Sequence, residues 1–246
     1  MLLEESQRWR RLFAEYVGSL LLTAIVIGSG IAAQTLSPHA LGLELLENAA
    51  ATGVGLYVLI LTFGAISGAH FNPVISFVDA AFHGISWRTA WSYGAAQVSG
   101  CLSGAVLANL MFARVAISLS TDDRATLAHG LSEVVATAGL VLVIFALART
   151  GRSSLAPAAV GAYIACAYFF TSSTSFANPA IVVGRMFSNS FAGIAPSSAP
   201  WFVLAEVVGG VLGFVLVKVL YPGISSRDAS TVTVAHDAVA GEGSSS

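Results

Sequence analysis

Two asparagine–proline motifs, each set in apolar sequence, carry the residue types of this chain best suited to chemistry in a pore. They are Asn72, Pro73 and Val74, and Asn178, Pro179 and Ala180. Proline suits the first turn of a helix, where its missing N–H is not needed, and the asparagine before it can cap that helix. Two short helices that meet N-terminus to N-terminus inside a membrane present positive dipole ends at their meeting point. Such a meeting point favours neutral solutes and repels cations.

The asparagines can also order water at that point. We expect Asn72 and Asn178 to cap their helices with the side-chain oxygen and to point amide N–H groups into the lumen. A water molecule that accepts from both turns its own hydrogens outward, which interrupts a proton wire. Two half-charges at ~5 Å and an effective dielectric of ~20 repel a cation by on the order of 3 kcal/mol. Capping alone is the simpler interpretation, but the duplication of the motif favours the pore.

The composition of the chain indicates that these motifs lie in a membrane. Hydrophobic residues make up 56% and charged residues 10% of the 246 residues, whereas soluble domains carry about 25% charged residues. The net charge of -2 and the lack of a basic cluster give no indication of nucleic-acid binding. Cys101 and Cys166 both lie in apolar segments, so we expect no disulfide, and no metal or cofactor motif is apparent. The sequence predicts an integral membrane protein.

Six apolar segments are long enough to cross a bilayer, which needs ~20 residues. The predicted spans are 12–33, 48–68, 89–112, 127–148, 155–172 and 200–221. The motifs open stretches too short to span, and we predict half-helices over 72–82 and 178–188. The segment 1–11 is predicted to be cytoplasmic, 12–221 to form the membrane domain, and the Ser-, Ala- and Gly-rich 222–246 to be disordered.

The distribution of basic residues predicts the orientation. One side of a six-span arrangement carries most of them: Arg8, Arg10, Arg11, Arg88, Arg149, Arg152, Lys218 and Arg227. Only Arg114 and Arg124 lie in loops on the other side. The positive-inside rule therefore places both termini in the cytoplasm, in a multi-pass protein of the cell's inner membrane.

An internal repeat relates the two halves, about 12–112 and 127–221. Glu15 in the first span matches Glu133 in the fourth, and Ala96–Gly104 aligns with Ala205–Gly213. Three spans per half force opposite orientations, which makes the repeat an inverted one. A carboxylate inside a span needs partners. We expect Glu15 and Glu133 to accept hydrogen bonds from the backbone of the re-entrant segments, as structural braces. Asp79 and His83 are predicted to be rim residues.

These features together resemble the aquaporin, or major intrinsic protein, family. The resemblance covers about residues 12–221 and implies an all-α membrane protein with six transmembrane helices and two re-entrant half-helices. It also implies a homotetramer in the lipid bilayer with one pore per subunit. The residues before each motif would line the pore with backbone carbonyls: Gly68, Ala69, His70 and Phe71, then Thr174, Ser175, Phe176 and Ala177. His70 is either a vestibule residue or a packing residue of its loop.

The selectivity filter is where the sequence departs from that family. Most members carry arginine directly after the second motif, and this chain has Ile181. Arg185 lies one helical turn further on and is a poor geometric substitute. The remaining filter positions map to Thr52, to Cys166 or Tyr168, and to Ser175 or Phe176. A filter of Thr52, Cys166, Ser175 and Ile181 would be wide and weakly polar, unlike that of a strictly water-selective channel.

The expected function is a passive channel for water and small uncharged solutes such as glycerol, which excludes ions and protons. The segment "TSSTSFANPA" followed by an aliphatic residue resembles a bacterial subgroup associated with arsenic resistance, which adds arsenous acid and methylated arsenicals as candidates. The alternative is an energised secondary transporter that uses an intramembrane carboxylate. No catalytic motif appears, so we do not expect an enzyme.

Overall fold

The computed structural model describes residues 2–222, with side chains from Glu5 onward. Six helices in this range are long and apolar enough to cross a membrane, as predicted. They are α1 (Leu2–Leu36), α2 (Leu41–Ser67), α4 (Trp87–Met111), α5 (Leu127–Arg149), α6 (Ala156–Phe170) and α8 (Ala199–Leu220), with a short 3-10 helix, Ser153–Leu155, before α6. The predicted tail, 222–246, lies almost wholly outside the described residues.

Two short helices follow the asparagine–proline motifs. They are α3 (Pro73–Ala81) and α7 (Pro179–Arg185), each with proline at the start and asparagine as the N-cap. The Oδ1 atom of Asn72 accepts from the Val74 N–H at 3.0 Å, and that of Asn178 accepts from the Ala180 N–H at 3.0 Å. The prediction of capped half-helices is confirmed, although α7 ends three residues before the predicted boundary.

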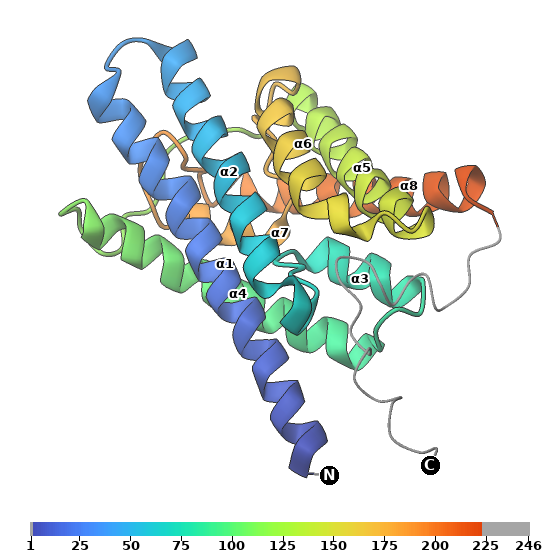
Figure 1. Cartoon of the computed structure of the whole chain (residues 1–246). Coiled ribbons are helices and arrows are strands. Elements are labelled where there is room, and N and C mark those ends of the chain that lie inside the picture. Colours follow the sequence, from blue (N-terminus) through green and yellow to red (C-terminus); the bar gives the residue numbers. More distant parts are fainter. Residues whose placement is uncertain (1, 223–246) are drawn as a thin grey trace, which may run out of the picture.

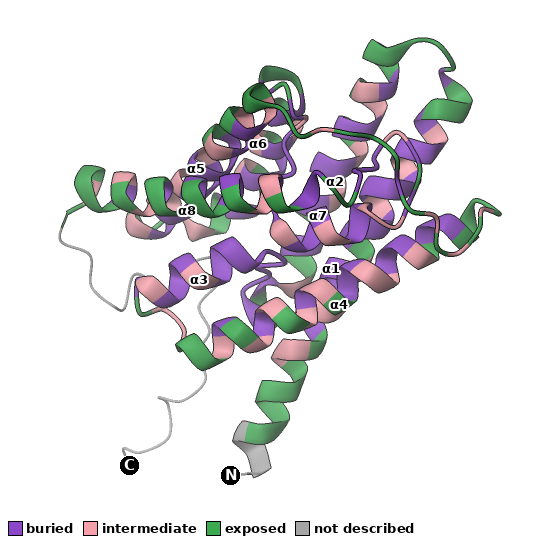
Figure 2. Ribbon diagram, turned by 180° about the vertical axis from the view of Figure 1, so that it is seen from behind, coloured by how far each residue is buried: buried purple, intermediate pink, exposed green. Residues whose placement is uncertain are grey.

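The helices form two matching halves around α3 and α7 (Figure 1). In the first half α1 packs on α4 and α2, and in the second half α5 packs on α8 and α6. Helices α2 and α6 pack together across the two halves. The all-α fold with two half-helices in an inverted repeat is therefore confirmed. Buried residues concentrate around α3, α7 and the middle of α1, while the outer faces and ends are exposed (Figure 2).

Glycines let α1 and α4 in the first half, and α5 and α8 in the second, approach closely. A Cβ atom on Gly100 or Gly104 would lie 2.3 Å from the carbonyl oxygen of Tyr16 or Leu20 in α1. In the second half, a Cβ atom on Gly209 would lie 2.6 Å from the Val134 oxygen of α5. Because real side chains do not tolerate such distances, these glycines are required where the backbones touch. The repeated glycines thus build the protomer.

The boundaries differ most at the first two spans. Helix α1 begins ten residues before the predicted span, so the basic segment that includes Arg8 and Arg11 forms its first turns. Helix α2 begins at Leu41, seven residues early, and includes the polar residues Glu44, Glu47 and Asn48. Hydropathy marks the apolar part of a helix, whereas these helices continue through polar turns at either end of the apolar stretch.

Candidate functional site

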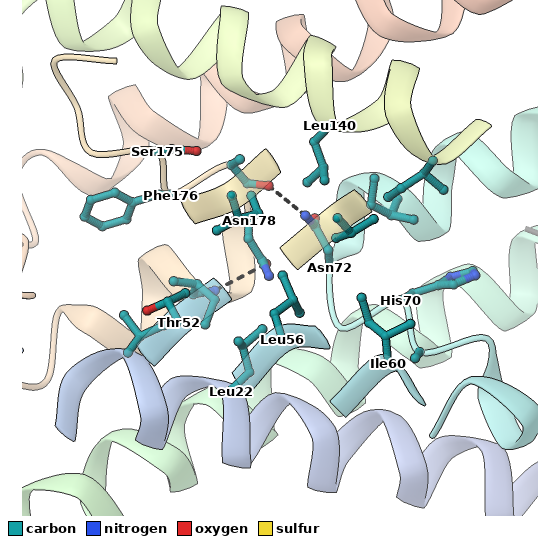
Figure 3. Close-up of a pocket in the computed structure, with 18 of the residues that line it drawn as sticks. Leu22, Thr52, Leu56, Ile60, His70, Asn72, Leu140, Ser175, Phe176 and Asn178 are labelled. Atoms are coloured by element: carbon teal, nitrogen blue, oxygen red, sulfur yellow. Dashed lines mark hydrogen bonds between the residues drawn. The ribbon is translucent and has the colours of Figure 1, made fainter. Parts of the chain in front are cut away.

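The two re-entrant segments are held together by a reciprocal pair of hydrogen bonds. The Nδ2 atom of Asn72 donates to the Ala177 carbonyl at 2.7 Å, and that of Asn178 donates to the Phe71 carbonyl at 2.7 Å. Figure 3 draws the bond from Asn72 between the two half-helices. Each asparagine therefore caps its own helix with the oxygen and fixes the opposite loop with the nitrogen. The N-termini of α3 and α7 are locked against each other.

Each loop adopts left-handed backbone at matching places. In the first loop Gly68, Ala69 and Phe71 have φ values of 90°, 48° and 49°. The second loop repeats the pattern at residues four, three and one before its asparagine: Thr174 at 63°, Ser175 at 47° and Ala177 at 47°. Residues other than glycine rarely adopt this conformation, and each costs on the order of 1–3 kcal/mol. The surroundings must hold these loops in place.

Glu15 supplies that support in the first half. Its carboxylate accepts from the His70 N–H at 3.0 Å, the Phe71 N–H at 2.8 Å and the Ser67 hydroxyl at 2.6 Å. The Gln97 Nε2 atom donates to the same carboxylate at 2.7 Å. All the oxygens of this fully buried carboxylate are therefore engaged with the loop and its neighbours.

Glu133 and Glu206 supply the support in the second half. Glu133 accepts from the Phe176 N–H at 3.0 Å and from the Ala177 N–H at 2.7 Å. Glu206, at the position that matches Gln97, accepts from the Asn178 N–H at 2.8 Å. Glu133 thus bonds re-entrant backbone as predicted for a brace, and Glu206, which was not predicted as one, does the same.

A cavity of about 60 Å³ lies beside the asparagine pair. At ~15 Å³ per water position this is room for about four waters. Of the six motif residues, Asn72 and Asn178 line it. The prolines begin the half-helices, Ala180 is fully buried, and Val74 packs against Gly210 of α8. Much of the wall is aliphatic, with Leu22, Leu56, Ile60 and Leu140 around the asparagines (Figure 3).

One end of this cavity holds most of the predicted filter. Thr52, Ser175 and Phe176 lie on the same side of the asparagine pair (Figure 3), and Ile181 also lines the cavity. Ser175 and Phe176, which the sequence offered as alternatives, both contribute. The Ser175 hydroxyl is buried and has no hydrogen-bond partner among the described residues. It is therefore a buried polar group beside the cavity whose hydrogen-bonding capacity is unused.

The remaining filter position belongs to Tyr168, and the choice of Cys166 is wrong. Cys166 is exposed on the outer face of α6. Tyr168 lines the cavity, and its hydroxyl lies 3.2 Å from the Thr52 hydroxyl. Two residues along a helix are about 200° apart around its axis, so only one of the pair can face inward.

The prediction that eight carbonyl-bearing residues line the pore is only partly right. Ala69, His70, Ser175, Phe176 and Ala177 line the cavity, whereas Gly68, Phe71 and Thr174 do not. The Phe71 ring packs against Gly18 of α1, and its carbonyl is taken by Asn178. The carbonyl of Ala177 is likewise taken by Asn72. These two carbonyls accept the hydrogen bonds that join the two loops.

Arg185 also lines the cavity, although the sequence suggested a poor position. The side chain is buried, and its guanidinium carbon lies 3.4 Å from the ring centroid of Phe176. Its Nε atom donates to the carbonyl of Ala192 in the following loop. The length of the arginine side chain lets it fold back from the end of α7 onto this ring. A cation thus sits beside the filter without being adjacent to the motif.

The loop before α5 is hydrogen-bonded to the segment that follows α7. Ser118 and Ser120 donate backbone hydrogen bonds to the carbonyls of Phe187 and Met186, just after α7. Within this loop, hydrogen bonds from the Ser198 hydroxyl and the Ala125 N–H lower the pKa of Asp123. The stability that these hydrogen bonds to the Asp123 carboxylate contribute is present at neutral pH. It is lost as the pH falls through the lowered pKa of Asp123.

The other end of the cavity is lined by His70 (Figure 3). Its Nδ1 atom lies 3.0 Å from the Ser76 hydroxyl, and its Nε2 atom lies 3.5 Å from the Asp79 carboxylate. Asp79 is 2% exposed, so its prediction as a rim residue is wrong, whereas His83 is exposed. In α3, residues three apart share a face, which places Ser76 and Asp79 together beneath the histidine.

A multi-pass helical membrane protein with a cavity between two opposed half-helices is the class that this fold and site define. Residues 2–177 match the family described as major intrinsic protein. The aquaglyceroporin AqpS of Rhizobium meliloti is 44% identical over 88% of this chain and 92% of its own length. The glycerol uptake facilitator of Bacillus subtilis is 32% identical over 82% of this chain and 80% of its length. The chain belongs to the major intrinsic protein family.

The fold agrees with a solved member of the same class. The X-ray structure of the aquaglyceroporin from Plasmodium falciparum superimposes with a TM-score of 0.66, covering 87% of this chain and 98% of that one at 19% identity. This likeness concerns the fold. Members of the family are channels, so the chain is not an enzyme.

Proposed function

We propose that this protein is a passive channel for water and for glycerol-like neutral solutes. The observation that carries the proposal is the cavity that passes Asn72 and Asn178 where the N-termini of α3 and α7 meet. Each asparagine amide has two N–H groups, of which one binds the opposite loop. The other is the donor that a passing solute meets. A neutral hydroxyl accepts this bond, while the two dipole ends repel a cation.

The outer end of the cavity sets the size of the solute. Thr52, Tyr168 and Ser175 offer hydroxyl groups, and Ile181 offers an aliphatic surface beside them. A polyol needs both, because its hydroxyls require partners and its carbon chain does not. The relatives named for glycerol or as aquaglyceroporins agree with this choice. With the aliphatic residue after the second motif, arsenous acid and methylated arsenicals also belong to the candidate solutes.

The alternative, an energised transporter, has less support. Coupling needs a carboxylate or cation site on the transport path. Glu15, Glu133 and Glu206 bond re-entrant backbone, and none of them is among the described residues that line the cavity. We therefore propose that these carboxylates hold the loops in shape. We further propose that both termini are cytoplasmic and that four copies assemble with one pore each.

The test is a solute panel in proteoliposomes. Water, glycerol, urea and arsenous acid are compared with protein-free liposomes of the same lipid and size. We expect water and glycerol to cross faster with the protein present, and arsenous acid to follow glycerol because it is a small neutral hydroxylated molecule. Accelerated water with unchanged glycerol would contradict the solute class, and no acceleration of either would contradict the channel.

A further inference from the structure

A second polar pocket lies away from the pore, between the first turns of α1 and α4. Its volume is about 340 Å³, and it is lined by Arg8 and Arg11 from α1 and by Thr89, Ser92 and Tyr93 from α4. Arg8 reaches across, with its Nη2 atom 3.5 Å from the Ser92 hydroxyl. Of the described residues that line the pocket, none is acidic. Two guanidinium groups beside hydroxyl donors form a site for an anion with several oxygens.

The level of the pocket relative to the membrane surface indicates which kind of molecule carries that anion. Residues 5–10 of α1 project from the bundle and are exposed (Figure 2). Large aromatic residues are exposed on the same turns of these two helices: Trp9 and Phe13 on α1, with Trp87 and Trp91 on α4. Tryptophan concentrates where a membrane meets water, because its ring is apolar and its N–H is polar. The pocket therefore opens at the level of lipid headgroups.

We propose that this pocket binds the phosphate group of an anionic phospholipid. Arg8 and Arg11 hold the phosphate oxygens, the Ser92 and Thr89 hydroxyls add hydrogen bonds, and the acyl chains run along the exposed apolar side of α4. Basic pockets between helices at the membrane surface recognise acidic headgroups in this way. The apolar stem of Leu12 also lines the pocket, which suits the glycerol backbone of a lipid better than a free ion.

The pocket is connected to the first re-entrant loop. Tyr93 forms its inner wall, is buried, and donates its hydroxyl to the Ser67 carbonyl at 2.9 Å. The Ser67 hydroxyl in turn donates to Glu15, the brace of that loop. The Tyr93 ring also packs edge-on against His70, at 5.5 Å between centroids. A lipid bound beside Tyr93 therefore lies next to the residues that hold the first re-entrant loop.

Thermal unfolding in a neutral detergent tests the proposal. Dioleoyl phosphatidylglycerol, dioleoyl phosphatidylcholine and inorganic phosphate are each added to the parent, to Arg8→Gln/Arg11→Gln and to Arg10→Gln. Arg10 lies on the same helix but does not line the pocket, so its variant removes one positive charge without changing the site, against the two charges that the double variant removes. Each arginine is expected to change the dissociation constant about fivefold.

The expected result is an upward Tm shift with phosphatidylglycerol for the parent and for Arg10→Gln, and a shift that is largely lost in the double variant. Phosphatidylcholine and phosphate should shift the parent little. The proposal would be overturned if the double variant kept the shift of Arg10→Gln. It would also be overturned if the double variant lost only about twice what Arg10→Gln loses, because diffuse charge would then explain the effect. The same shift with inorganic phosphate would overturn the assignment to a lipid, and the same shift with phosphatidylcholine would overturn the assignment to an acidic headgroup.

Discussion

At the level of single residues, two buried carboxylates hold the re-entrant backbone beside the pore in place. Glu15 and Glu133 each accept two consecutive N–H groups from loops whose neighbouring residues are left-handed. Without these acceptors, the N–H groups would be buried and unpaired at membrane depth, where no water replaces the bond. Their position in the sequence was predictable because a glutamate in an apolar span needs a partner, and the repeat placed both.

Replacing Glu133 should reveal this role. Glu133→Ala leaves the N–H groups of Phe176 and Ala177 without an acceptor, at about 1–3 kcal/mol each. Glu133→Gln keeps one acceptor oxygen and should fall between the alanine variant and the parent. We expect folded yield and Tm in detergent to decrease from the parent to Glu133→Gln and then to Glu133→Ala. The Tm should fall by about 2–4 °C for each kcal/mol lost. An alanine variant with parental yield and Tm would show that Glu133 does not brace the loop.

Replacing Ile181 should narrow the filter. Ile181→Arg places a long side chain with five donors in the cavity, beside the guanidinium that Arg185 already contributes. We expect the ratio of glycerol to water permeability in proteoliposomes to fall by on the order of tenfold, which corresponds to ~1.4 kcal/mol in the barrier. Ile181→Leu, of equal volume, is the control and should leave the ratio nearly unchanged. If the arginine variant keeps the parental ratio, the constriction lies at Tyr168 or Arg185.

At the level of helices, glycine contacts set how closely each pair of long helices can pack. Gly104→Ala would place a methyl group 2.3 Å from the Leu20 carbonyl, so α1 and α4 must separate. We expect a loss of about 1–3 kcal/mol and a lower Tm. Gly42→Ala in α2 is the matched control, since nothing lies within 4 Å of its added Cβ. Equal Tm values for the two variants would contradict the assigned helix contact.

The helices were predictable from the sequence and the loops were not. Length and hydropathy are sufficient to locate six spans, and Asn72 with Pro73 is sufficient to predict a capped half-helix. The lock between the loops joins residues 105 positions apart, and no local pattern predicts such a contact. The error at Cys166 has a similar origin, because only the folded chain shows which face of α6 turns inward. The placement of Arg185 depends on Phe176 and Ala192, which only the folded chain brings together.

At the level of the whole molecule, two half-proteins of opposite orientation make one site that neither contains. Asn72 comes from the first half and Asn178 from the second, and each completes the loop of the other. The cavity takes its wall from both halves, with Thr52 and Tyr168 meeting at one end and His70 at the other. Symmetry places both half-helix dipoles at the same point. The barrier to cations that we propose is therefore a property of the assembled fold.

Flux without an ion gradient tests that account most directly. Proteoliposomes with identical salt and pH on both sides receive an inward glycerol gradient, and swelling is recorded together with membrane conductance in a planar bilayer of the same lipid. Our account predicts glycerol flux well above that of protein-free membranes, with no dependence on sodium or protons and no ionic current. Glycerol flux that appears only with a sodium or proton gradient, or that carries current, would contradict a passive channel with a cation barrier at Asn72 and Asn178.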